Sequence, residues 1–221
     1  MTYKPLHIRI NCEINFFSGK GIPSGIRTIV LRGNSITSIE AISNLNSLEE
    51  LDLRANQFSV IDKRMFSGPK SLTFLDLGYN NITFVEENAF ASLGSLQSLL
   101  LDGNQLAFLH KGMFRKLTCL TFLSLRNNVI HFAETSAFSD LSALERLDIS
   151  ENQLTQVEQG TFKGLAKLTT LLVNGNNLSI IPPSAFVELK NLKFINLCDN
   201  YITEMAPLLF INLSISRNCH I

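Results

Sequence analysis

The sequence contains no tryptophan, has only four cysteines and carries no net charge, since Lys and Arg together number 19 and so do Asp and Glu. The absence of a polybasic run excludes a typical nucleic-acid or anionic-membrane surface. No window reaches the roughly 18 consecutive apolar residues that a transmembrane helix needs. The cysteines are scattered and form no C-x-x-C pair. They therefore predict neither a zinc site nor a disulfide framework.

The N-terminal stretch MTYKPLHIRINC also lacks the apolar run of a secretory signal peptide. On this evidence the chain is either intracellular, or its native N-terminus lies upstream of Met1. The apolar content of 45% in 221 residues is enough for one sizeable hydrophobic core and for no more than about two ordinary domains.

One pattern recurs along most of the chain. The frame L-x-x-L-x-L-x-x-N-x-L, as in LTFLDLGYNNI, repeats first after 22 residues and then every 24. Its asparagines are Asn34, Asn56, Asn80, Asn104, Asn128, Asn152, Asn176 and Asn200. From the second repeat onward a phenylalanine follows ten positions later, namely Phe66, Phe90, Phe114, Phe138, Phe162, Phe186 and Phe210. A fixed period of this length indicates a repeat architecture.

The pattern has a physical meaning. Alternation in L-x-L predicts a strand with one face inside and one outside. One turn cannot bury its leucines alone, whereas stacked turns bury them together. Each frame asparagine is expected to bond to backbone groups of the bend, where no strand partner exists. Strands pack about 4.8 Å apart, while the phenylalanine side is bulkier, so the stack should curve with the strands on its concave side.

This pattern resembles the leucine-rich repeat family. The 24-residue form with its phenylalanine series is similar to the "typical" subclass of animal extracellular proteins, such as Toll-like receptors, jawless-fish variable lymphocyte receptors and small leucine-rich proteoglycans. The resemblance implies an α/β solenoid, a curved horseshoe with a parallel β-sheet on its concave face and an irregular or short-helical convex side. It divides the chain into a cap-like segment 1–25, eight repeats over 26–213, and a truncated repeat or C-terminal cap start at 214–221.

The ends depart from the family pattern. Cys12, Ile22, Pro23 and Ile26 match the cysteine-bearing N-terminal cap of the subclass, but the further cysteines of that cap are absent upstream. Cys12 is therefore expected to be a free thiol. The first repeat is shorter and carries Asn44 where the phenylalanine would fall, a leaner form that resembles intracellular repeats. The C-terminal stretch INLSISRNCHI lacks the Trp and Cys pair of the usual C-terminal cap.

No constellation of catalytic residues is present. None of the four histidines shares a repeated column with an acid or a nucleophile. The segment GKGIPSG lacks the G-x-x-x-x-G-K-[ST] spacing of a phosphate loop and is predicted to be a turn of the cap. Cys198 is predicted to point outward and Cys219 inward, so they cannot form a disulfide. The sequence therefore predicts no enzyme, no metal site and no cofactor.

The outward strand positions vary between repeats. They lie six, four and two residues before each frame asparagine. In the third to fifth repeats they carry an apolar cluster with charged residues around it, as is typical of interaction surfaces, although scattered exposed apolar residues are also normal. The predicted ligand-binding surface consists of Phe74, Leu100, Phe122, Asp76, Arg126, Arg146 and Asp148.

A second variable column lies four residues after each frame asparagine and is expected to face the flank of the solenoid. It carries Phe84, Phe108 and Phe132 in successive repeats, here called the phenylalanine stripe. The stripe is interpreted either as a docking or homodimer face or as an aromatic ladder that stiffens the stack.

Three glycosylation sequons begin at Asn81, Asn177 and Asn212. Chance alone predicts about as many in a chain with 21 Asn, so their number carries no evidence, although their position on exposed bends would permit a glycan.

The leading hypothesis is recognition of a protein ligand by an ectodomain, or an ectodomain fragment, of an extracellular or cell-surface protein. One alternative is an intracellular scaffold of the same architecture. Another is the binding module of a larger signalling receptor or enzyme. None of the three requires a nucleic acid partner or insertion of this segment into a membrane.

Overall fold

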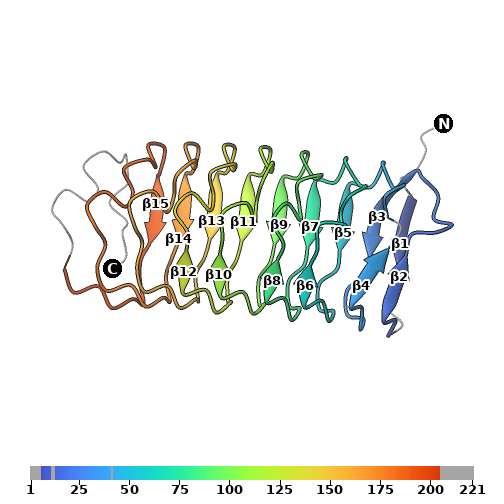
Figure 1. Ribbon diagram of the computed structural model, residues 1–221, viewed down its shortest axis with the longest axis horizontal. Helices are drawn as coiled ribbons and strands as arrows, with labels where there is room; N and C mark the ends of the chain where they lie inside the picture. Colours follow the sequence, from blue (N-terminus) through green and yellow to red (C-terminus); the bar gives the residue numbers. More distant parts are fainter. Residues whose placement is uncertain (1–5, 11–12, 41, 205–221) are drawn as a thin grey trace.

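The computed structural model describes residues 6–10, 13–40 and 42–204, and within them one strand from each turn joins a nine-stranded parallel sheet. Sequence neighbours in this series pair with each other, about one repeat apart, as Phe122 does with Arg146 (Figure 1). The strands are β1 (Leu6–Arg9), β3 (Ile26–Val30), β5 (Glu50–Asp52), β7 (Phe74–Asp76), β9 (Ser98–Leu100), β11 (Phe122–Ser124), β13 (Arg146–Asp148), β14 (Thr170–Leu172) and β15 (Phe194–Asn196).

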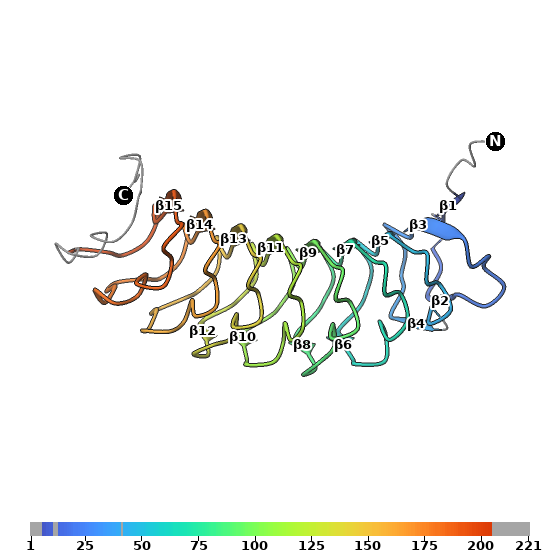
Figure 2. The ribbon, with the colours of Figure 1, turned by 90° about the horizontal axis from the view of Figure 1, so that it is seen from above.

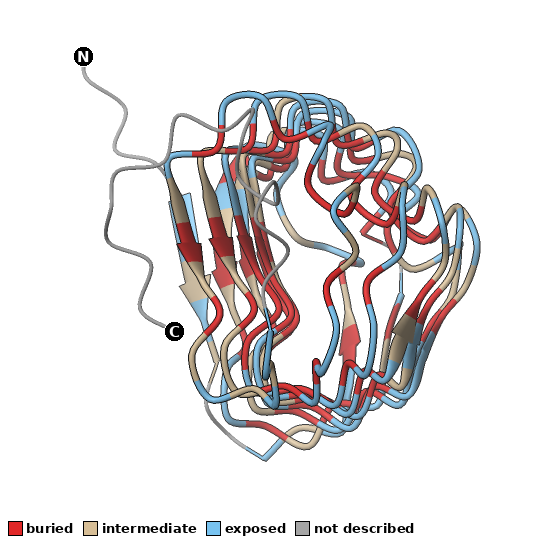
Figure 3. Cartoon of the chain, turned by 90° about the vertical axis from the view of Figure 1, so that its left-hand side faces the viewer, coloured by how far each residue is buried: buried red, intermediate tan, exposed pale blue. Residues whose placement is uncertain are grey.

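A second set of two- and three-residue strands lies across the core from the main sheet, on the outer side of the curve (Figure 2). They form three parallel pairs: β2 (Phe16–Ser18) with β4 (Ser38–Glu40), β6 (Val60–Ile61) with β8 (Phe84–Val85), and β10 (Phe108–Leu109) with β12 (Phe132–Ala133). The turns from β1 to β11 therefore enclose a core between two strand layers, whereas the described turns from β13 onward have no strand on the outer side. The buried segments face inward along the whole described part (Figure 3).

The convex side was expected to be irregular or short-helical, and within the described residues it is irregular and contains no helix. Single hydrogen-bonded turns follow each other instead, such as Leu93 N–H to the Phe90 carbonyl at 2.9 Å and Leu96 N–H to the Leu93 carbonyl at 3.0 Å. Asn88, with φ of 66°, begins this segment in the left-handed region. An α-helix would need a continuous series of bonds four residues apart, which these three-residue steps do not provide.

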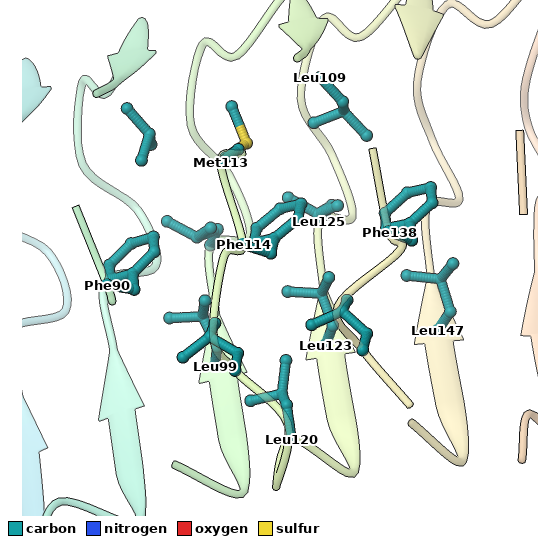
Figure 4. Packing of buried hydrophobic residues seen from close by; sticks show 14 of the residues in the cluster. Phe90, Leu99, Leu109, Met113, Phe114, Leu120, Leu123, Leu125, Phe138 and Leu147 are labelled. Carbon is teal, nitrogen blue, oxygen red and sulfur yellow. The ribbon is translucent and has the colours of Figure 1, made fainter. Parts of the chain in front are cut away.

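The phenylalanine series forms a stacked column in the core (Figure 4). The Phe114 and Phe138 rings lie 6.0 Å apart, and the neighbouring pairs Phe66–Phe90 and Phe138–Phe162 lie 5.8 and 6.3 Å apart. These spacings exceed the strand separation of about 4.8 Å on the opposite side. The stack therefore bends toward the sheet, which becomes the concave face (Figure 2). Phe210 lies outside the described residues.

Each frame asparagine bonds to backbone groups of two turns. Asn128 Nδ2 donates to the carbonyls of Leu125, in its own turn, and Leu101, in the preceding turn, at 3.0 and 2.9 Å. Its Oδ1 accepts from Leu106 N–H at 3.1 Å. A buried asparagine thereby pairs backbone groups that the bend leaves without strand partners. The same set of bonds recurs at Asn56, Asn80, Asn104, Asn152, Asn176 and Asn200.

Candidate protein-binding surface on the concave sheet

The apolar residues of the predicted surface lie on three consecutive strands of the main sheet. Phe74 on β7 and Phe122 on β11 both pair with Ser98 on β9, which separates them by two strand spacings, about 10 Å. Leu100 lies on that middle strand, one outward position further along. All three apolar side chains are partly exposed on adjacent strands of the concave sheet, with Ser98 between the two phenylalanines, and they are here called the apolar patch.

Arg146 extends this patch onto β13. It pairs with Phe122 across the two strands, and its guanidinium carbon lies 5.6 Å from the centre of the Phe122 ring. A guanidinium at this distance from an aromatic face is attracted by the ring quadrupole. The exposed arginine is thus positioned beside the aromatic anchor rather than on a distant rim.

The acidic residues of the surface are buried and take part in the strand ends. Asp76 Oδ1 accepts a hydrogen bond from Gly78 N–H at 2.8 Å, and Asp148 Oδ1 accepts from Ser150 N–H at 3.0 Å and from its hydroxyl at 2.5 Å. Asp52 has the same bond to Arg54 N–H. One oxygen of each carboxylate therefore holds the bend that follows its strand.

A hollow of about 570 Å³ lies at the carboxyl ends of these strands. Four of the predicted residues line it, whereas Phe74, Phe122 and Arg146 do not. The surface therefore has two adjoining parts, an apolar patch and a polar hollow. The lining consists of Arg54, Asp76, Gly78, Tyr79, Leu100, Asp102, Ser124, Arg126, Asn127, Asp148 and Glu151.

Two carboxyl groups of the hollow have perturbed pKa values. Burial raises the pKa of Asp102, the hydrogen bond from the Ser124 hydroxyl opposes this, and the charge of Asp148 raises it further. Burial also raises the pKa of Asp76, where the bond from Gly78 N–H opposes the shift and the nearby carboxylate of Asp102 adds to it. Both groups hold a proton more tightly than an exposed aspartate does.

The sequence reasoning did not assign Tyr79, Asp102 or Arg54 to the site. Asp102 and Arg54 occupy the third outward column, and their grouping depends on the bend after the strand. Tyr79 lies in the bend itself, immediately before a frame asparagine, where its φ is 55°. The guanidinium carbon of Arg54 lies 4.5 Å from the centre of its ring.

The residue before each frame asparagine adopts a left-handed backbone. The φ values at Gly33, Ala55, Tyr79, Gly103, Asn127, Glu151, Gly175 and Asp199 all lie between 53° and 72°. Glycine or asparagine suits this conformation, while a tyrosine is unusual there. The tyrosine is 52% exposed and lines the hollow. The signal in the sequence is therefore an aromatic residue in a column otherwise filled by small or polar side chains.

The phenylalanine stripe lies on the convex side, opposite the main sheet, and not on the flank where it was expected (Figures 2 and 3). Phe84 and Phe108 are exposed and Phe132 is half-buried. The Phe108 and Phe132 rings are parallel within 6° at 5.7 Å. His110, which the sequence reasoning did not include, stacks between Phe84 and Phe108 at 5.7 and 6.3 Å.

The remaining predicted positions are distributed over the turns. Asn81 and Asn177 are exposed just beyond the bends, while Asn212, Cys12 and Cys219 lie outside the described residues. Within the described part of the chain, no group of three or more His, Cys, Asp and Glu side chains has the arrangement of a metal site. No helix in that part is long and apolar enough to cross a membrane.

These features define a curved parallel-strand solenoid of about eight turns with a hollow of about 570 Å³ on its concave sheet. A family model described as "Leucine rich repeat" matches residues 46–106, 118–178 and 167–218, which is most of the chain. The chain belongs to the leucine-rich repeat family, and its fold is that of a protein-interaction module. The 24-residue subclass remains a prediction.

Two similar proteins agree with this assignment. Over 73 residues the chain is 38% identical to leucine-rich repeat-containing protein 3 of Danio rerio, a segment that covers 32% of this chain and 27% of the relative. Among solved structures, internalin C2 from Listeria monocytogenes superimposes with a TM-score of 0.68 at 30% identity, covering 87% of this chain and 81% of the internalin. The chain thus matches the fold over most of its length and spans about a quarter of the curated relative.

Proposed function

We propose that the chain is a non-catalytic recognition module that binds a protein ligand on its concave sheet. The observation that carries this proposal is the apolar patch of Phe74, Leu100 and Phe122 beside the polar hollow. Central aromatic anchors next to charged groups are the composition of protein interfaces. Burial of a fully exposed side chain of this size is worth about 1.5–3 kcal/mol. The three anchors are already partly buried, so covering their remaining surface contributes a part of that free energy for each.

The hollow complements the apolar patch by its charge. It contains the carboxylates of Asp76, Asp102, Asp148 and Glu151 and the guanidiniums of Arg54 and Arg126. A cationic or hydrogen-bond-donating side chain of the ligand would enter next to the carboxylates and would favour their ionised form. The proposed ligand therefore presents an apolar residue flanked by a polar or basic one.

We place the module outside the cell or at its surface. The resemblance of the repeats to the typical extracellular subclass supports this setting, and Asn81 and Asn177 are exposed enough to carry glycans. The alternative setting, an intracellular scaffold, is favoured by the leaner first repeat. Expression through a secretory pathway, followed by intact mass measurement with and without glycan removal, distinguishes the two settings, because intracellular repeats need not tolerate glycans at these sites.

The binding surface is tested by selection and substitution together. Binders are selected from a displayed library of protein ectodomains, and their affinities are measured for Phe122→Asp and for Thr170→Asp. Both positions occupy the same outward column, but Thr170 lies on β14, two strands from the Phe122 patch. The proposal expects loss of binding for Phe122→Asp alone. Binders that tolerate both changes, or lose affinity equally for both, would show that the ligand uses another surface.

A further inference from the structure

The phenylalanine stripe continues onto the turn before it, where Val60 is 41% exposed in the same column. Four adjacent turns thus present Val60, Phe84, Phe108 and Phe132 on the convex side. The column is polar on either side, with Ser38 before the stripe and Gln156 after it. A whole aromatic side chain has about 150 Å² or more of surface, of which Phe84 exposes 49% and Phe108 37%. Together the four side chains form a contiguous apolar patch, and monomeric proteins rarely expose a patch of more than a few hundred Å² without a use.

The stripe is also a rigid surface. The backbone ladder joins β6 to β8 and β10 to β12. Between these pairs, His110 Nε2 donates to the Val85 carbonyl at 2.7 Å, while the imidazole ring lies between Phe84 and Phe108. The equivalent carbonyls, those of Ile61 and Leu109, accept from backbone N–H groups at 2.9 Å. A surface held in this way loses little conformational entropy when it is covered.

Charges beside the stripe change sign between its two central turns. The Phe84 turn carries Glu86 and Glu87, whereas the Phe108 turn carries Lys111 beside His110. Glu86 accepts from the backbone N–H of Lys63. Glu87 forms an exposed ion pair with Arg115 at 2.8 Å. Glu87 and Lys111 are both exposed, so one carboxylate of the Phe84 turn and one ammonium group of the Phe108 turn are accessible to a partner.

The outer turns of the stripe differ in charge as well. The Val60 turn carries Lys63 and Arg64 beside Asp62, which is paired with Arg64. The Phe132 turn carries Glu134, which accepts from the Lys111 backbone N–H at 2.6 Å. The charge beside the stripe therefore alternates from turn to turn. It is positive at the Val60 turn, negative at the Phe84 turn, positive at the Phe108 turn and negative at the Phe132 turn.

From this arrangement we infer that the phenylalanine stripe is the interface of a homodimer in which two copies pack convex side to convex side. The two-fold axis lies between the Phe84 and Phe108 turns, parallel to their strands. Phe84 then faces Phe108 of the second copy, and Val60 faces its Phe132. The same operation brings Lys111 next to Glu87 of the second copy, twice in each dimer, because such an interface is isologous.

Other registers along the stripe are unfavourable. An axis through the Phe108 turn places Lys111 next to Lys111 of the second copy. An axis through the Phe84 turn places Glu87 next to Glu87 of the second copy. An axis between the Val60 and Phe84 turns places Phe108 against the polar Ser38 of the second copy. An axis between the Phe108 and Phe132 turns places Phe84 against its Gln156. Like charges in contact and desolvated polar groups both oppose association. The order of residues along the stripe therefore selects one antiparallel register.

The size of the stripe sets the strength of the dimer. Two convex surfaces touch over only a few turns, which matches the length of the apolar column. A standard stable interface buries about 800 Å² on each partner, and the exposed parts of three aromatic rings and one valine supply less than half of this. The charged side chains beside them supply part of the remainder. The dimer is therefore reversible and forms in the micromolar range.

Charge reversal in trans tests this interface. Lys111→Glu and Glu87→Lys each place two like-charge contacts in their own homodimer, and each should dissociate about tenfold or more readily than the unchanged chain. An equimolar mixture of the two variants should regain the affinity of the unchanged chain, because the mixed pair has opposite charges at both contacts. Contacts within one chain cannot produce this recovery. Sedimentation equilibrium and light scattering over a concentration series measure it.

Two further variants complete the experiment. Phe108→Asp should abolish association while the melting temperature stays within a few degrees of that of the unchanged chain. Ile180→Asp, which changes a 73% exposed residue of the same column outside the stripe, should leave association unchanged. The inference is overturned if the unchanged chain stays monomeric, if the mixed charge variants fail to associate, or if Phe108→Asp lowers only the melting temperature.

Discussion

The carboxylate of Asp102 accepts a hydrogen bond from the hydroxyl of Ser124 on the neighbouring turn, inside the polar hollow of the concave sheet. The hydrogen bond favours the ionised carboxylate, whereas burial and the charge of Asp148 disfavour it, and the raised pKa shows that the latter effects prevail. The charge of the Asp102 carboxylate in the hollow therefore lowers the stability of the folded chain. A cation on a bound ligand would offset this free-energy cost.

The first prediction concerns the cost of this charge. A raised pKa means that the folded state binds the proton more tightly than the unfolded chain, so the group contributes stability below the ordinary aspartate pKa of 3.8 and loses it as the pH rises through the folded pKa. Asp102→Asn keeps an oxygen that accepts from Ser124 and removes the charge. It should raise the melting temperature at pH 7, by about 2–4 °C for each kcal/mol relieved.

The increase in melting temperature caused by Asp102→Asn should shrink toward zero as the pH falls below 3.8. There the Asp102 carboxyl of the unsubstituted chain is already protonated in the folded and the unfolded state. Thermal melts from pH 3 to pH 8 measure this trend. A variant that is less stable than the native chain at pH 7, or equally changed at every pH, would mean that the Ser124 bond outweighs burial.

The second prediction concerns the frame asparagines. Asn128→Ala removes the acceptor of the buried Leu106 N–H, and it removes one of the two asparagine donors to each of the Leu101 and Leu125 carbonyls, which keep Asn104 and Asn152. Leaving the buried Leu106 N–H unpaired should lower the free energy of unfolding by about 1–3 kcal/mol. Denaturant titration measures the loss, with the exposed Asn177→Ala as the control. Equal stability of the two variants would remove the structural role of the frame asparagine.

The third prediction concerns the packing of one turn on the preceding one. A Cβ added at Gly68 would lie 1.9 Å from Cα of Ser43, a backbone atom that cannot rotate away. Gly68→Ala should therefore force the two turns apart and cost about 1–3 kcal/mol, the range of overpacked sites. Gly94 has no atom within 4 Å of its added Cβ. Gly94→Ala should leave the denaturation midpoint unchanged, and a similar loss in both variants would contradict the steric explanation.

The regular part of the structure could be predicted from the sequence because it follows the period. The leucine alternation, the curvature and the direction of Phe74 and Phe122 all depend on contacts that recur in every turn. The convex side could not be predicted in the same way. Its segments vary between turns, and short helices, single turns and two-residue strands differ by only a few backbone hydrogen bonds.

The candidate site shows the same division. Leu100 and Asp76 could be placed on the concave side because they occupy strand columns, whose direction is fixed by alternation. Tyr79 was missed because its position depends on the left-handed bend before Asn80, and the space beside it is left by Gly103, where an added Cβ would lie 2.9 Å from the tyrosine ring. His110 was missed because it bonds to the Val85 carbonyl where β8 and β10 do not pair, and no pattern in the sequence indicates that the pairing is interrupted there.

The fourth prediction connects the proposed extracellular setting with the proposed dimer. Asn81 is exposed and lies three residues before Phe84 on the same turn, so a glycan on its side chain would reach over the Phe84 turn of the phenylalanine stripe. Chain secreted with this glycan should therefore associate more weakly than the Asn81→Gln variant from the same cells, because covering the Phe84 turn excludes the second copy. The sequon at Asn177 lies on a turn beyond the stripe. Asn177→Gln should remove a glycan and leave association unchanged. Sedimentation of the three secreted forms at matched concentrations measures the difference. If all three associate equally, the second copy does not cover the Phe84 turn, and the antiparallel register centred between Phe84 and Phe108 is wrong.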